Sequence, residues 1–155
     1  MDVHSKSIRS KNMKAIKNRD TAPELLVRRL LHKNGYRYRI APTTKPGKPD
    51  IWMAKWNTSI FINGCFWHMH NCDRFKLPEE RQEFWKEKLL KNKNRDMEKV
   101  KQLHDLGVRV LVIWECSLIG KKKIRKETIM TLIKTFLFTS YRAAEITPNG
   151  LTIIY

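Results

Sequence analysis

Apolar and polar positions along the chain predict helices and strands in turn. A helix is expected to begin at Thr21, because Thr-x-x-Glu reads as a capping box and Pro23 suits a first turn. Apolar residues then recur at helical spacing until Gly35, a typical C-terminal stop. Two further helices are expected over roughly residues 79–106 and 126–139, the second with apolar residues on one face.

Strands are expected between these helices. Alternating apolar residues at 36, 38 and 40 predict one, and the runs DIWMA (50–54) and TSIFIN (58–63) predict two more. The run VRVLVIW (108–114) is uninterrupted, which is typical of a central strand covered on both faces. A last strand, LTIIY (151–155), is expected at an edge. The sequence therefore predicts a single α/β domain over residues 1–155, with a central mixed sheet flanked by helices.

The charge of the chain indicates a polyanionic partner. Lys and Arg outnumber Asp and Glu by 32 to 15, a net charge of +17, and residues 1–40 alone carry +8. Neutralised phosphates release counterions, so nucleic acid is favoured over a merely soluble basic protein. Residues 1–20 are expected to form a basic DNA-binding arm that stays mobile in the free protein. No stretch is apolar enough for a membrane span or a secretory signal, so a cytoplasmic protein without a membrane partner is expected.

Three cysteines and nearby histidines form a candidate metal site. Cys65 and Cys72 flank two histidines, and Cys116 follows the buried run. Three thiols and one imidazole suit a closed, four-coordinate structural zinc. The spacing leaves open whether His68 or His70 is the ligand, and three unrelated core cysteines are the alternative.

Acidic residues supply candidate catalytic groups. Asp50 follows a turn-rich loop and could hold Mg²⁺ at the sheet edge, although an Asp beside Pro is often only a turn residue. Metal-dependent nucleases with a Pro-Asp strand commonly carry an acidic-x-Lys pair on the following strand. This sequence has no such pair, which leaves His68 as the candidate base. Asp96 could orient this histidine, or it could only form an ion pair within its helix. Glu24 is also an acidic candidate, but the capping box already explains its presence at that position.

Aromatic pairs stand beside these groups. Phe66-Trp67 and Phe84-Trp85 are flanked by basic residues and could insert between DNA base steps. Packing in the core is the alternative, and exposure of the rings to solvent would distinguish the two.

Several blocks resemble one known family. SKSIRSKNMKAIKNRDTAPE (5–24), PGKPDI (46–51), NGCFWHMHNC (63–72), FWKEKLLKNKNRD (84–96) and GVRVLVIWEC (107–116) are similar to the very-short-patch repair endonucleases of bacteria. The resemblance implies a restriction-endonuclease-like fold with a structural zinc. It also implies a Mg²⁺-dependent, strand-specific nicking enzyme that cuts 5′ of the thymine in T:G mismatches left by deamination of 5-methylcytosine.

The resemblance also implies roles for individual residues. Asp50 and the main-chain carbonyl of Ile62 would hold Mg²⁺, and Glu24 would lie near the ion without binding it directly. His68 would be the catalytic histidine, and Asp96 would be its carboxylate partner. The implied zinc ligands are Cys65, His70, Cys72 and Cys116. The implied DNA wedge is Phe66, Trp67 and Trp85. Asn63 stands where well-known members have His, so it can hydrogen-bond but cannot titrate.

Two other functions compete with a mismatch-specific nuclease. A zinc-stabilised, non-catalytic DNA-binding module would explain the cysteines and the charge but would leave Asp50 and His68 without a task. A restriction-type nuclease would cut matched DNA on both strands. In the favoured interpretation the partner is double-stranded DNA with a T:G mismatch, and repair proteins are further candidate partners. A monomer is expected because an asymmetric lesion needs one active site.

Overall fold

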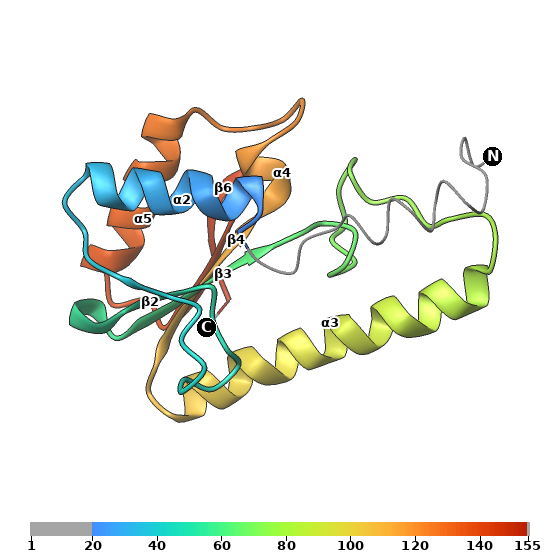
Figure 1. Ribbon diagram of the computed structural model, residues 1–155, viewed down its shortest axis with the longest axis horizontal. Coiled ribbons are helices and arrows are strands. Elements are labelled where there is room, and N and C mark those ends of the chain that lie inside the picture. The colour runs from blue at the N-terminus through green and yellow to red at the C-terminus, as the bar shows by residue number, and fades with distance from the viewer. Residues whose placement is uncertain (1–19, 155) are drawn as a thin grey trace.

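A single mixed sheet of six strands, ordered β1 to β6, organises the part of the chain that the computed structural model describes, residues 20–154 (Figure 1). The strands are β1 (Arg39–Ile40), β2 (Ile51–Met53), β3 (Thr58–Asn63), β4 (Arg109–Trp114), β5 (Ala143–Thr147) and β6 (Gly150–Ile153). The helices are α2 (Ala22–Lys33), α3 (Gln82–Asp105), α4 (Glu115–Leu118) and α5 (Lys126–Phe138), with a 3₁₀ turn, η1, over Ala54–Trp56.

The centre of the sheet is parallel and its borders are antiparallel. β3 pairs with β4 in parallel, from Thr58 opposite Arg109 to Asn63 opposite Trp114, and β4 pairs with β5 in the same sense. α3 and α5 provide the two crossovers that parallel neighbours require. β1, β2 and β6 add antiparallel partners outside this centre. The α/β class, the mixed sheet and the central place of the 108–114 run are confirmed.

Helices cover both faces of the sheet. Side chains alternate along β3, so Ile60 and Ile62 join the larger core, which α2, α4 and α5 cover. Phe61 points to the opposite face, where Val110 and Leu103 complete a smaller core beneath the C-terminal half of α3. The N-terminal half of α3 extends well past the sheet (Figure 1). None of the helices among the described residues is both long and apolar enough to cross a membrane.

Three local expectations differ from the structure. The strand expected over residues 36–40 is reduced to Arg39–Ile40, because Tyr38 turns under α2 and donates its hydroxyl hydrogen bond to the carbonyl of Arg28, at 3.0 Å. The capping box does not form: Thr21 makes no side-chain cap, and Glu24 accepts a hydrogen bond from the N–H of Asp20 instead, at 2.8 Å. β5 and the short α4 were not expected. The predicted basic arm lies outside the described residues apart from Asp20.

Candidate active site and metal centre

Asp50 is fixed where β2 and β3 run side by side. It directly precedes β2, and the antiparallel register of Ile51 with Ile60 brings its carboxylate beside Ile62. The N–H of Ile62 donates a hydrogen bond of 2.7 Å to Oδ2 of Asp50. The sheet register therefore holds a carboxylate next to the main chain near the carboxyl end of β3.

The surroundings of Asp50 disfavour its negative charge. Burial raises the pKa of the Asp50 carboxyl from 3.8 to about 6, and the nearby Glu24 carboxylate raises it as well. The Ile62 N–H and the His68 and Lys99 side chains act in the opposite direction. A partly buried carboxylate of this kind is stabilised by a cation, because a cation offsets the lost hydration.

His68 and Asp96 form a pair across two elements. His68 lies in the irregular segment after β3, where its main-chain N–H donates a hydrogen bond to the carbonyl of Gly64. Asp96 lies in the middle of α3. Nδ1 of His68 contacts Oδ2 of Asp96, and both side chains are about three-quarters buried. The carboxylate engages Nδ1, so Nε2 is the nitrogen left to exchange a proton.

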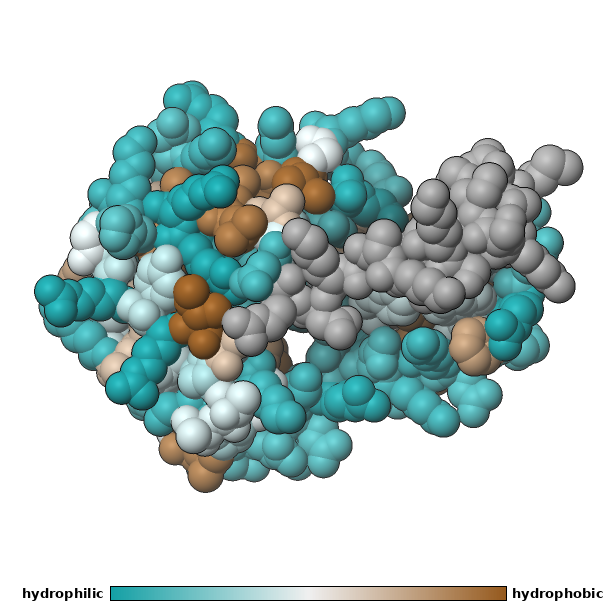
Figure 2. All heavy atoms as spheres, viewed as in Figure 1, coloured by the Kyte–Doolittle hydropathy of each residue, from teal (hydrophilic) through white to brown (hydrophobic). Residues whose placement is uncertain are grey.

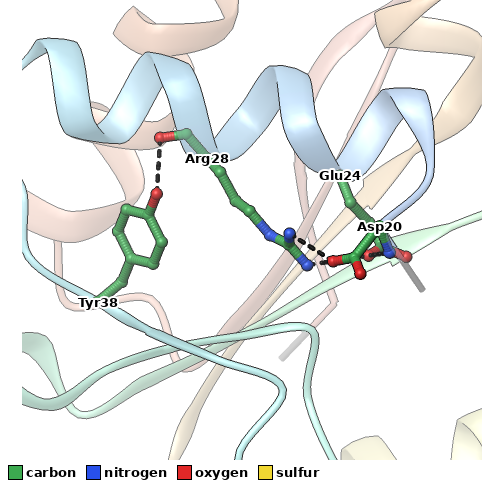
Figure 3. Close-up of polar contacts among 4 residues, drawn as sticks. All are labelled: Asp20, Glu24, Arg28 and Tyr38. Carbon is green, nitrogen blue, oxygen red and sulfur yellow. Dashed lines mark hydrogen bonds and ion pairs between the residues drawn. The ribbon is translucent and has the colours of Figure 1, made fainter.

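Glu24 forms an ion pair with Arg28 and accepts a hydrogen bond from the main-chain N–H of Asp20 (Figure 3). Its Oε2 accepts from Nη2 of the buried Arg28, at 3.3 Å, and Nη1 of Arg28 contacts Asp20 at 2.7 Å. Glu24 is 4% exposed. Because one buried guanidinium pairs with two carboxylates, the first turn of α2 is anchored beside Asp50.

These groups line one cleft of about 710 Å³. The predicted residues found there are Glu24, Asp50, Ile62, Asn63, Trp67, His68 and Asp96. Lys48 and Glu115 also line it, and these two were not predicted. Lys88 and Lys99 line it as well, and they belong to the 86–101 helix whose basic residues were expected to hold the DNA backbone. The spacing of 88, 96 and 99 places all three on one helix face. The cleft thus combines carboxylates, an imidazole and ammonium groups.

A second cluster joins the three cysteines to one histidine. The ligand atoms of Cys65, His70, Cys72 and Cys116 all lie within 4.8 Å of one another. Nδ1 of His70 is 3.6 Å from Sγ of Cys65 and 3.6 Å from Sγ of Cys116. Tetrahedral bonds of about 2.3 Å to sulfur and about 2.0 Å to nitrogen place such donors about 3.6 Å apart. The geometry fits a zinc-like ion, and it places His70 here and His68 in the cleft.

The protonation chemistry of this cluster also fits a cation. Burial raises the pKa of the Cys65 thiol, and the neighbouring Cys116 and Cys72 thiols raise it further. Burial lowers the pKa of His70, which favours the neutral imidazole that ligates metals. The ring of His70 stacks on Trp114, with centroids 4.0 Å apart. The site therefore supplies sulfur donors and a neutral imidazole, and a bound cation would stabilise the thiolate form of the cysteines.

The aromatic residues gather between α3 and the segment after β3. The ring of Phe66 lies 5.0 Å from Trp67 and 5.6 Å from Trp85, and the two tryptophans are 6.0 Å apart. All three are partly exposed, and the ammonium group of Lys88 lies 5.7 Å from each tryptophan ring. The rings pack on one another and still reach solvent, so both the packing and the wedge interpretations stay open.

The comparisons with known proteins assign this fold and cleft to a class, the endonucleases with a restriction-endonuclease-like sheet. A model of the family described as DNA mismatch endonuclease Vsr matches residues 1–74. The chain is 40% identical to the DNA mismatch endonuclease Vsr of Escherichia coli K12, over 99% of this chain and 98% of that one. It is also 40% identical to a type II nicking enzyme, V.NmeAIP of Neisseria meningitidis, over 86% of this chain and 94% of that one.

The chain belongs to the Vsr family of DNA mismatch endonucleases. A further relative, the type II nicking enzyme V.XorIIP of Xanthomonas oryzae, is 38% identical over 76% of this chain and 88% of its own. The expected family is confirmed. The roles assigned to individual residues stay predictions.

Proposed function

We propose that this protein nicks double-stranded DNA on the 5′ side of the thymine in a T:G mismatch and so starts very-short-patch repair of deaminated 5-methylcytosine. The observation that carries the proposal is the cleft in which Asp50 lies with the His68–Asp96 pair. The names of the relatives, a mismatch endonuclease and nicking enzymes, support it. We expect it to act as a monomer on DNA in the bacterial cytoplasm.

Asp50 and the carbonyl of Ile62 are the proposed holders of Mg²⁺. The donor set fits, because a partly buried carboxylate with a raised pKa lines the cleft and hard oxygen ligands suit Mg²⁺. The ion would supply charge neutralisation at the scissile phosphate. Glu24, anchored by Arg28, adds a second negative charge behind Asp50.

His68 is the proposed base. Its Nε2 would take the proton of the attacking water, while Asp96 keeps Nδ1 engaged and stabilises the imidazolium that forms. Lys99 lies on the same face of α3, one turn beyond Asp96, and lines the cleft with Lys48. Both ammonium groups would attract the DNA backbone.

Zinc is the proposed occupant of the cluster of Cys65, His70, Cys72 and Cys116, where it would tie the segment after β3 to the end of β4. The basic arm, residues 1–20, and the partly exposed rings of Phe66, Trp67 and Trp85 are proposed to bind the duplex. A mismatched step costs less to unstack than a matched one, so an aromatic wedge would favour it.

The test is a nicking assay with Mg²⁺ on labelled duplexes that differ only in T:G or C:G at one methyltransferase site. We expect a single cut in the thymine strand of the mismatch, lost in Asp50→Asn with DNA binding retained. Asp105→Asn is the matched control, because it removes the charge of an exposed aspartate outside the cleft.

Three results would contradict the proposal. Cutting of the matched duplex on both strands would indicate a restriction-type nuclease. Tight binding without any cut by the wild type would favour a non-catalytic DNA-binding module. Equal loss of activity in the two aspartate variants would remove the special role of Asp50.

A further inference from the structure

A groove on the outer surface lies between α2 and α5, and its floor is apolar. It has a volume of about 570 Å³. Leu26, Leu30, Ile119 and Met130 contribute apolar side chains to it. Figure 2 shows apolar atoms at the surface in the region of these helices, with hydrophilic atoms on either side. Covering surface of this kind with a partner lowers the free energy, because apolar area is removed from water.

The rim of the groove is basic. Arg29 and Lys33 of α2 and Lys126 and Lys134 of α5 line it, and all four side chains are exposed. Among the described residues no carboxylate forms an ion pair with any of them. The single acidic residue in the lining, Glu127, is paired with Arg125 at 3.8 Å. The rim therefore offers four positive charges that no carboxylate in residues 20–154 pairs with, around an apolar floor.

The groove faces away from the cleft. At about 100° per residue, Ala22, Leu26, Arg29 and Lys33 fall within an arc of about 60° on α2, whereas Glu24 points about 180° from its centre. Glu24 lines the cleft, and Ala22 and Leu26 line the groove. The cleft and the groove therefore use opposite faces of α2.

We propose that this groove binds an acidic amphipathic helix of a partner protein. Its two walls are helices, and α2 offers about three turns, so a third helix can pack along it with apolar residues at i, i+3 or i+4, and i+7. Acidic residues flanking that apolar stripe would meet the four rim cations. The DNA backbone could satisfy the rim but has no apolar surface to cover Leu26 and Ile119, which are partly exposed.

The experiment uses the full-length protein and a fluorescein-labelled, lactam-bridged helical peptide of about four turns, with a leucine stripe flanked by glutamates. Anisotropy titrations compare it with a second peptide in which the leucines are serines and the charge is unchanged. The groove variant is Arg29→Glu with Lys134→Glu, both at exposed positions. The matched control is Lys48→Glu with Lys88→Glu, which reverses two exposed charges in the cleft.

We expect the groove variant to weaken binding of the leucine peptide by about tenfold or more, and the cleft variant to change it less than about threefold. The serine peptide should bind at least about tenfold more weakly than the leucine peptide. Nicking of the T:G duplex by the groove variant should stay at the wild-type rate, which separates this proposal from the proposed function.

Three outcomes would overturn the proposal. No binding of the leucine peptide would show that the groove does not accept such a helix. Equal binding of both peptides, or loss in the cleft variant, would mean that an acidic chain binds a protein of net charge +17 without using the groove. A loss of duplex affinity in the groove variant as large as that in the cleft variant would make the groove a DNA surface.

Discussion

Replacing one cysteine of the proposed zinc cluster tests whether a metal stabilises the fold. Cys116 is 4% exposed, and without a metal Cys116→Ala removes a single buried sulfur, a loss of about 1 kcal/mol. With a structural zinc the substitution also removes metal binding, worth about 10 kcal/mol or more in zinc-finger peptides and comparable with the whole stability of a domain. The expected losses in the free energy of unfolding, with and without a structural zinc, therefore differ by nearly an order of magnitude.

The difference translates into melting temperature. At about 2.1 cal/mol/K per residue, a chain of 155 residues has an unfolding entropy of about 0.3 kcal/mol/K, so 1 kcal/mol lowers the Tm by about 3 °C. We expect Cys116→Ala to lower the Tm by more than about 15 °C or to prevent folding, since several kcal/mol are lost.

The assay is thermal unfolding by circular dichroism together with the zinc content of the purified protein. Ser117→Ala is the matched control: Ser117 is fully buried on the same short helix, donates one hydrogen bond of 2.6 Å to the carbonyl of Trp114, and is outside the donor set. A zinc-free wild type, or a Tm shift no larger for Cys116→Ala than for Ser117→Ala, would refute the reasoning.

Three predictions concern the cleft. Asp96→Asn should slow single-turnover nicking by about 10²-fold or more with duplex affinity unchanged, because His68 loses its partner carboxylate; an unchanged rate would argue against the pair. In fixed-time assays at low Mg²⁺, the nicking rate should fall as the pH drops through about 6, since protonated Asp50 cannot hold the cation. The pH at which the rate falls should decrease as the Mg²⁺ concentration is raised, and a pH profile that does not change with Mg²⁺ would contradict this. Trp67→Ala should reduce the T:G over C:G preference more than overall affinity in competition binding, and an equal loss on both duplexes would exclude a wedge.

The strands that the sequence predicted well are those with strong apolar runs. β3 is buried along its whole length and β4 at every position except its two ends, so both faces are covered and the apolar runs are nearly continuous. β5 was missed because it opens with Ala143 and Ala144, poor strand formers that are buried here against β4 and β6. Its pairing depends on tertiary contacts that no local pattern reveals.

The two histidines show the same limit within the site. His68 and His70 stand two residues apart, and spacing could not assign either one to the metal. Met69 between them has a φ of 53°, a left-handed conformation, and the chain turns there so that one imidazole joins Asp96 and the other joins the cysteines. The resemblance made this assignment from matched positions, whereas the local backbone conformation that separates the two imidazoles cannot be derived from spacing.

The end of β4 connects the two sites. Trp114 stacks on His70 with rings 7° from parallel, and its ring also lies 6.3 Å from that of His68. The carboxylate of the next residue, Glu115, accepts the N–H of Cys65 at 3.2 Å and lines the cleft as well. A metal that holds Cys116 and His70 in place would therefore also hold Trp114 and Glu115, which lie beside His68. Removal of the zinc by a chelator, followed by an assay with Mg²⁺ in excess of the chelator, should then slow nicking before circular dichroism shows loss of the sheet, because the base would lose its support while β3 and β4 remain paired.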